Sequence, residues 1–190
     1  MAAVTKERIV SAASKLFYGE GIGRVSMDAV AEKAGVTKRT LYYHFRSKDD
    51  LVAAYLDGRD QPNLALFQRW FAGTNGGLAD KTRGIFLNLG QSARHPKWKG
   101  CGFLRTMAEL ANMPGHPAMK VGAEHKKKFE QWIRTMVEAE GIEDGLRLAR
   151  QIMLLLDGAF AVTLLHRDAS YMETAGEAAY SLVKTALASR

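Results

Sequence analysis

The chain has 190 residues, 47% of them hydrophobic, which is enough to bury the core of one domain or of two small ones. Its single cysteine, Cys101, excludes an intramolecular disulfide framework and fits a reducing cytoplasm. The formal net charge of +7 favours polyanions as partners, most of all where the basic side chains cluster. Prolines are few and helix-forming residues recur at helical spacing, so we expect a soluble, cytoplasmic, all-α protein.

Two features argue against association with a membrane. The first residues contain no apolar stretch of signal-peptide length. The longest apolar run, residues 152–165, contains Asp157 and is about 14 residues long, whereas a membrane-spanning helix needs roughly 20. We therefore expect this run to form a buried helix, and we expect no membrane partner.

The first predicted helix begins with Thr5 as its cap and ends near Gly19. Apolar residues recur along it at the spacing of a single helix face: Ile9, Ala12, Ala13, Leu16 and Phe17. This stripe predicts one buried side, and the glycine-rich residues 19–23 predict a loop after the helix.

Three further helix starts follow closely, which indicates a compact local unit. Ser26 is expected to cap a short helix that Gly35 ends in the left-handed conformation. Thr37 is expected to cap the next helix, which reaches Phe45, and Ser47 is expected to cap a fourth.

Residues 26–45 meet the requirements of a helix-turn-helix, in which two short helices cross through a tight turn. Ala31 is small enough for the helices to approach closely. Gly35 tolerates the positive φ of the turn, and the apolar Val36 closes the corner. The spacing therefore predicts a complete helix-turn-helix at this point of the chain.

The second helix of this motif has a predicted inner face and a predicted outer face. Leu41 and Phe45 stand four residues apart and face inward, so a rotation of about 100° per residue places Arg39 and Tyr43 on the opposite side. The outer groups are cations, hydroxyls and phenols that can reach phosphate oxygens and base edges: Lys38, Arg39, Thr40, Tyr42 and Tyr43. Arg39 could bind a guanine through two hydrogen bonds, worth roughly 1–3 kcal/mol of discrimination.

Basic residues are concentrated around this helix. From Thr37 to Lys48 there is no carboxylate, and there are four cations: Lys38, Arg39, Arg46 and Lys48. Lys48 lies in the first turn of the fourth helix, where free amide groups can bind a phosphate. The alternative interpretation is a solvated basic face in an ordinary helical bundle; the turn geometry favours DNA binding.

The segment resembles the N-terminal domain of the TetR family of repressors over roughly residues 5–52. The resemblance is most specific in residues 40–45 together with the Ser47-Lys48 pair that follows. It implies a homodimer that reads double-stranded operator DNA with one recognition helix per half-site. Carried over by position, it implies DNA contacts from Thr37, Lys38, Tyr42, Tyr43 and His44, with Lys48 on a phosphate.

Beyond residue 50 longer helices are predicted, near residues 49–72, 78–94, 101–112, 116–140, 143–166 and 170–188. We expect two domains. Residues 1–50 form a three-helix, helix-turn-helix DNA-binding domain, and residues 51–190 form a helical ligand-binding and dimerisation domain. In the second domain the chain resembles the family only in its general arrangement of helices. The resemblance there implies an architecture and no particular effector.

Two groups of residues in the second domain are predicted to have separate roles. Aromatic and flexible side chains on the central helices are candidates for the pocket of an apolar small-molecule effector: Phe86, Phe103, Met107, Trp132, Met136 and Met153. Small or apolar residues on the last two helices are candidates for the dimer interface: Gly158, Ala159, Ala161, Ala175, Ala178, Ala179 and Leu182. Ordinary packing within the chain is the alternative for both groups.

No catalytic or cofactor site is predicted. The string His166-Arg167-Asp168 matches a kinase catalytic loop without the Asn and the glycine-rich strand that such a loop requires. The five histidines fall at no metal-ligand spacing. We therefore expect a transcriptional regulator, namely a repressor that an unidentified small molecule releases from its operator. A helical enzyme or carrier, an activator and an architectural DNA binder are the alternatives.

Overall fold

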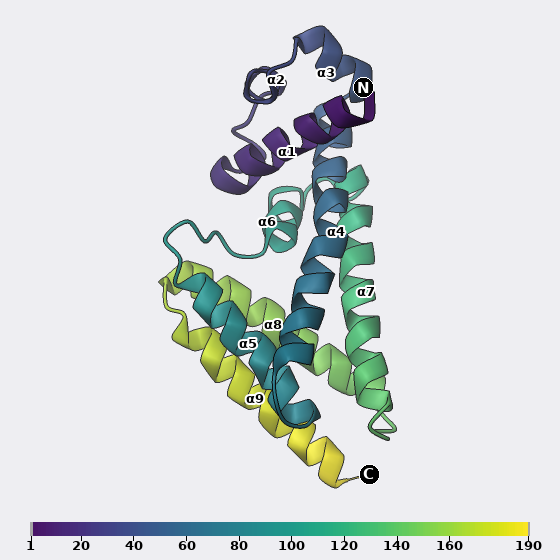
Figure 1. Cartoon of the computed structure of the whole chain (residues 1–190), viewed down its shortest axis with the longest axis vertical. Helices are drawn as coiled ribbons and strands as arrows, with labels where there is room; N and C mark the ends of the chain where they lie inside the picture. The colour runs from purple at the N-terminus through teal and green to yellow at the C-terminus, as the bar shows by residue number, and fades with distance from the viewer. Residues whose placement is uncertain (1, 190) are drawn as a thin grey trace. The chain divides into compact units, whose positions relative to one another are not determined.

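The computed structural model describes residues 2–189, and within them the chain forms helices and no strand (Figure 1). The all-α prediction is therefore confirmed over the described residues. In chain order the helices are α1 (Ala2–Glu20), α2 (Met27–Ala34), α3 (Lys38–His44), α4 (Lys48–Gly73), α5 (Leu78–Ala93), α6 (Gly102–Glu109), α7 (Pro117–Glu138), α8 (Gly145–His166) and α9 (Ser170–Ala188).

The contacts between residues divide the chain into two compact units. The first unit contains the residues up to Pro62 together with Cys101–Glu124, and the second contains Asn63–Gly100 and the chain from His125 onward. The head of the molecule, α1 to α3, therefore shares its unit with the first part of α4, with α6 and with the start of α7. The domain boundary expected after residue 50 stays a prediction.

The core of the first unit lies where α1, α2 and α3 meet the start of α4. The apolar stripe of α1 points into it, and Ile9 and Ala13 are fully buried. Val30 of α2 and Leu51 of α4 are equally buried. The Arg8 guanidinium donates hydrogen bonds to the carbonyl oxygens of Ala34 and Gly35 at 3.0 and 3.1 Å, which ties α1 to the last turn of α2.

Most of the predicted helix ends in this unit are confirmed. The Ser26 hydroxyl accepts a hydrogen bond from the Ala29 amide at 3.1 Å and so caps α2. Gly35 ends α2 with φ +62°, a left-handed conformation in which glycine has no steric cost. The Ser47 hydroxyl accepts from the Asp50 amide at the start of α4. The cap predicted at Thr5 is wrong, because α1 begins three residues earlier at Ala2.

The second unit is built mainly from α5, α8 and α9, and α5 runs beside α9 in Figure 1. Two glycines allow this close approach. A Cβ atom on Gly176 of α9 would lie 2.9 Å from the Cβ of Phe86, and one on Gly90 of α5 would touch Met172. Arg83 of α5 adds an ion pair to Glu177 of α9 at 3.3 Å. Small residues thus set the distance between these helices, and charged residues border the contact.

Helix α8 differs from the expectation for residues 152–165. It has 22 residues, and by length and composition alone it could cross a membrane, a property shared by core helices of soluble proteins. Its burial is one-sided. Ile152 and Leu156 are buried in the unit, whereas Leu154 and Leu165 are 74% and 76% exposed. The prediction of a buried helix therefore holds for one face of α8 and is wrong for the other.

Candidate nucleic-acid interface

Helix α3 presents its predicted outer face to solvent. Leu41 is completely buried and Phe45, which caps the helix, is 4% exposed, so this side of α3 faces the core. Tyr43 is 81% exposed, Tyr42 is 43% exposed, and Arg39 also lies on the surface. The inward and outward faces inferred from helical spacing are therefore both confirmed.

Hydroxyl groups organise the first turn of α3. The Thr37 hydroxyl accepts a hydrogen bond from the Thr40 amide at 3.1 Å and caps the helix as predicted. The Thr37 and Thr40 hydroxyls are also hydrogen-bonded to each other at 2.8 Å. Together these bonds fix the N-terminal turn, which in a helix-turn-helix carries the residues that contact base edges.

Lys38 has a partner that the sequence analysis did not anticipate. Its ammonium lies 2.9 Å from one carboxylate oxygen of Asp28 and 3.1 Å from the other. Hydrogen bonding to Asp28, with the attraction of its charge, raises the pKa of Lys38 above its ordinary value. Asp28 itself lies in the first turn of α2, where the helix dipole favours an acid.

The remaining predicted DNA-contacting residues surround this face. His44 is half-buried, and its ring meets the Tyr43 ring edge-on with centroids 5.2 Å apart. Lys48 lies half-buried in the first turn of α4. Among the described residues no carboxylate lies within ion-pair distance of Arg39, Arg46 or Lys48. These three cations are therefore available to an external anion.

A second feature that the sequence did not reveal is the attachment of α6 to the head within the first unit. The Arg105 guanidinium donates to the Tyr18 carbonyl at the end of α1 at 2.8 Å. The Glu109 carboxylate accepts from the Gly23 amide in the α1–α2 loop at 3.0 Å. These partners are 86 or more residues apart in the chain, so no local pattern could have predicted the pairs.

A buried histidine makes a further contact with the helix that carries Lys48. His116, which precedes α7, accepts the Ala118 amide on Nδ1 at 3.1 Å, and its Nε2 lies 3.3 Å from the Asp49 carboxylate in the first turn of α4. Because Nδ1 acts as an acceptor, Nε2 carries the proton and donates to Asp49. The start of α7 is therefore linked to the turn of α4 that holds Lys48.

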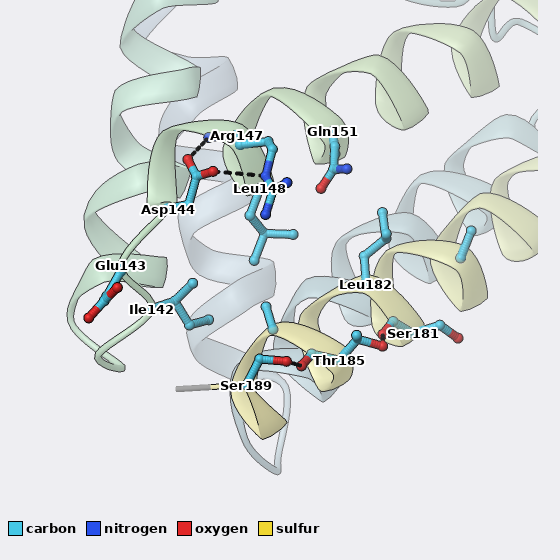
Figure 2. Close-up of a pocket in the computed structure, with 12 residues that line it drawn as sticks. Ile142, Glu143, Asp144, Arg147, Leu148, Gln151, Ser181, Leu182, Thr185 and Ser189 are labelled. Carbon is cyan, nitrogen blue, oxygen red and sulfur yellow. Dashed lines mark hydrogen bonds and ion pairs between the residues drawn. The ribbon is translucent and has the colours of Figure 1, made fainter.

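A cavity of about 730 Å³ lies in the second unit, between the first turns of α8 and the last turns of α9 (Figure 2). Its apolar wall includes Ile142, Leu148 and Leu182. Arg147 borders it and pairs with Asp144 at 2.8 Å. None of the six residues predicted for an effector pocket lines this cavity. Phe103 and Met107 lie in the first unit and the other four in the second, and their role stays a prediction.

The predicted dimer residues divide into two sets. Ala159 and Ala179 are buried within the protomer, so they pack inside the chain. The other residues of the set remain accessible or half-accessible: Gly158, Ala161, Ala175, Ala178 and Leu182. Ala178 and Leu182 also line the cavity between α8 and α9. Their part in an interface between copies stays a prediction.

Comparison with known proteins agrees with this geometry. The profile of the family described as "Bacterial regulatory proteins, tetR family" matches residues 9–55, which include the whole helix-turn-helix. The regulator TtgR of Pseudomonas putida is 43% identical over 53 residues, which are 28% of this chain and 25% of TtgR. The chain thus matches about a quarter of the length of this curated relative.

Solved structures match almost the entire chain. SCO4454, a TetR-family transcriptional regulator from Streptomyces coelicolor, is 30% identical with a TM-score of 0.77, over 97% of this chain and 95% of that protein. A TetR-type transcriptional regulator from Streptomyces avermitilis is also 30% identical with a TM-score of 0.77, over 92% and 97%. The chain belongs to the TetR family of DNA-binding transcriptional regulators, with an N-terminal helix-turn-helix and a C-terminal helical domain.

Proposed function

We propose that this chain is a sequence-specific transcriptional regulator that inserts α3 into the major groove of its operator. The orientation of α3 carries the proposal. Leu41 holds one side of the helix in the core, and the opposite side exposes Tyr43 and Arg39. A cationic, phenol-bearing face without carboxylate partners at Arg39, Arg46 and Lys48 suits base edges and phosphates.

We further propose that the protein acts as a homodimer through α8 and α9. Exposed leucines at positions 154 and 165 accompany the small exposed residues Gly158 and Ala161 on α8. An apolar helix face of this kind is stabilised when another apolar surface covers it. A second copy of this chain fits this face as the partner, because helix-turn-helix dimers bind two half-sites related by symmetry.

A small-molecule effector and a repressing role complete the proposal. The solved relatives are regulators of the same two-domain architecture. A ligand that binds one conformation of the helical domain better than another shifts the equilibrium toward that conformation and changes DNA affinity. In the first unit, Arg105 and Glu109 of α6 hold the end of α1 and the α1–α2 loop, so a displacement of α6 would disturb the head directly.

The proposal places the protein in the cytoplasm, without a membrane partner, cofactor or catalytic activity. The string His166-Arg167-Asp168 runs from the last residue of α8 into the connection to α9, where the Asp168 carboxylate accepts a hydrogen bond from the Ser170 amide at 2.9 Å. This hydrogen bond gives the Asp168 carboxylate a structural role in the turn before α9. An activator would use the same DNA-binding face, and the position of the operator relative to the promoter distinguishes the two modes of regulation.

Binding to promoter DNA tests the proposal. We expect the purified protein to bind a duplex from upstream of its own or a neighbouring gene, with an affinity that falls steeply between about 50 and 200 mM salt. Tyr42→Ala removes a 43% exposed side chain from α3, and we expect it to weaken binding by about tenfold or more without loss of helical content. Fluorescence anisotropy with a labelled duplex measures both effects.

The matched control is Leu87→Ala, which removes a large side chain of nearly the same exposure, 44%, from α5, outside the proposed dimer helices. It should leave DNA affinity unchanged. A folded Tyr42→Ala variant with wild-type affinity would refute the role of α3, and a binding constant independent of salt would exclude the phosphate contacts.

A further inference from the structure

The ion pair between Asp28 and Lys38 lies on the proposed DNA-binding face. Asp28 occupies the first turn of α2 and Lys38 is the first residue of α3, so the pair spans the helix-turn-helix. The ammonium donates a hydrogen bond to one Asp28 carboxylate oxygen at 3.1 Å and lies 2.9 Å from the other. The side chains are 62% and 65% exposed, so both can also reach a macromolecule that binds this face.

Stability alone is a weak reason for this pair. Ion pairs between exposed side chains contribute roughly 0–1 kcal/mol, since water screens them and ordering the side chains costs entropy. The Asp28 carboxylate is also unfavourable for DNA binding at this position. In a helix-turn-helix the first helix crosses the DNA backbone, so an acid in its first turn approaches phosphates and repels them.

The pairing is selective among the cations of this region. Within the part of the chain that the structure describes, Lys38 has a carboxylate partner, and Arg39, Arg46 and Lys48 have none. Any duplex can therefore attract those three cations at once. While Asp28 stays in place it offsets the charge of the Lys38 ammonium, so this group, although it keeps N–H donors free, neutralises a phosphate less than the other three cations do.

We propose that Asp28 is a specificity-determining residue of the DNA-binding activity proposed above: it withholds the Lys38 ammonium from the phosphates of arbitrary DNA. Two neighbouring carboxylate oxygens hold the ammonium. In the major groove, O6 and N7 of guanine offer a comparable pair of acceptors to a lysine or an arginine. A site with guanine opposite the start of α3 can therefore take Lys38 from Asp28, and a site without it leaves the pair intact.

Salt dependence gives this inference a quantitative test. Each cation that neutralises a phosphate of duplex DNA adds about 0.9 to the slope of log affinity against log salt concentration. In Asp28→Asn the ammonium is free to neutralise a phosphate. We expect this variant to bind random-sequence duplex about 3- to 10-fold more tightly at 0.1 M salt, with a slope steeper by about 0.9.

The experiment compares the wild type with Asp28→Asn, Lys38→Met and the double variant. Each is titrated against a random-sequence duplex and against an operator selected from a random pool by the wild-type protein. Lys38→Met should weaken binding to the random duplex less in the wild type than in Asp28→Asn, because the ammonium neutralises a phosphate mainly where Asp28 no longer offsets its charge. The ratio of operator to random affinity should fall in Asp28→Asn.

Glu32→Gln is the matched control. It removes one exposed carboxylate from the same helix, α2, and no cation lies within ion-pair distance of Glu32 among the described residues. An equal gain in Glu32→Gln and Asp28→Asn would overturn the inference, because it would reflect net charge alone. The inference would also be overturned if Lys38→Met weakened binding to the random duplex as much in the wild type as in Asp28→Asn.

This inference rests on the proposed function, yet the two fail in different ways. If the wild type binds neither duplex at low salt, the proposed function fails. If the wild type binds both duplexes with the expected salt dependence and Asp28→Asn matches it on the random duplex, only the role of Asp28 fails.

Discussion

Leu41→Ala is expected to destabilise the DNA-binding head by roughly 2–5 kcal/mol. Leu41 is completely buried beneath α3, so the shorter side chain loses apolar contacts and leaves a cavity. A typical domain is stable by only 5–15 kcal/mol, so this loss is a large fraction of the total. Urea unfolding followed by circular dichroism, at fixed protein concentration, measures the change in free energy of unfolding.

The control for this substitution is Val4→Ala, which shortens an apolar side chain that is 61% exposed on α1. It should change stability by no more than about 0.5 kcal/mol. If Leu41→Ala cost less than about 1 kcal/mol, α3 would not be anchored in the core. The outward direction of Arg39 and Tyr43 would then lose its structural basis.

Arg39→Ala and Lys48→Ala are expected to weaken DNA binding in two distinguishable ways. Arg39 lies on the face that we place against base edges, so its loss should cost about 1–3 kcal/mol on the selected operator and much less on random duplex. Lys48 lies at the start of α4, where it suits a phosphate, so its loss should weaken both duplexes alike and reduce the salt slope by about 1. Anisotropy titrations at several salt concentrations measure both quantities.

Lys127→Ala is the control for removal of a positive charge, because this lysine is exposed on α7 outside the first unit. It should leave the difference between operator and random duplex unchanged. The assignment of roles would be refuted if Arg39→Ala weakened both duplexes equally, or if Lys48→Ala altered the preference for the operator.

Local patterns in the sequence predicted most of the fold. Capping residues with short side chains, such as Ser26 and Thr37, and the left-handed Gly35 fix helix ends through contacts within a few residues. Helical spacing then assigns Leu41 to the core and Tyr43 to the surface. These features depend on neighbours in the chain, which is why they can be derived from the sequence.

Other features depend on contacts between distant residues and could not be predicted in this way. The hydrogen bonds from Arg105 and Glu109 to the head join residues that are 86 or more positions apart in the chain. The pair between Asp28 and Lys38 crosses a turn, and its geometry depends on how α2 and α3 pack. Ala159 and Ala179 are small residues that helical spacing cannot assign to the protomer core or to an interface, and the structure buries both in the core.

The central claim is that the exposed side of α3 lies against DNA, and photocrosslinking from position 43 tests it most directly. A photoreactive phenylalanine analogue in place of Tyr43, which is 81% exposed, leaves the core undisturbed. We predict that it crosslinks efficiently to bases of the selected operator, whereas the same analogue at Tyr171 on α9 does not. Crosslinking from Tyr171 with none from Tyr43, in a protein that binds the operator normally, would contradict the account.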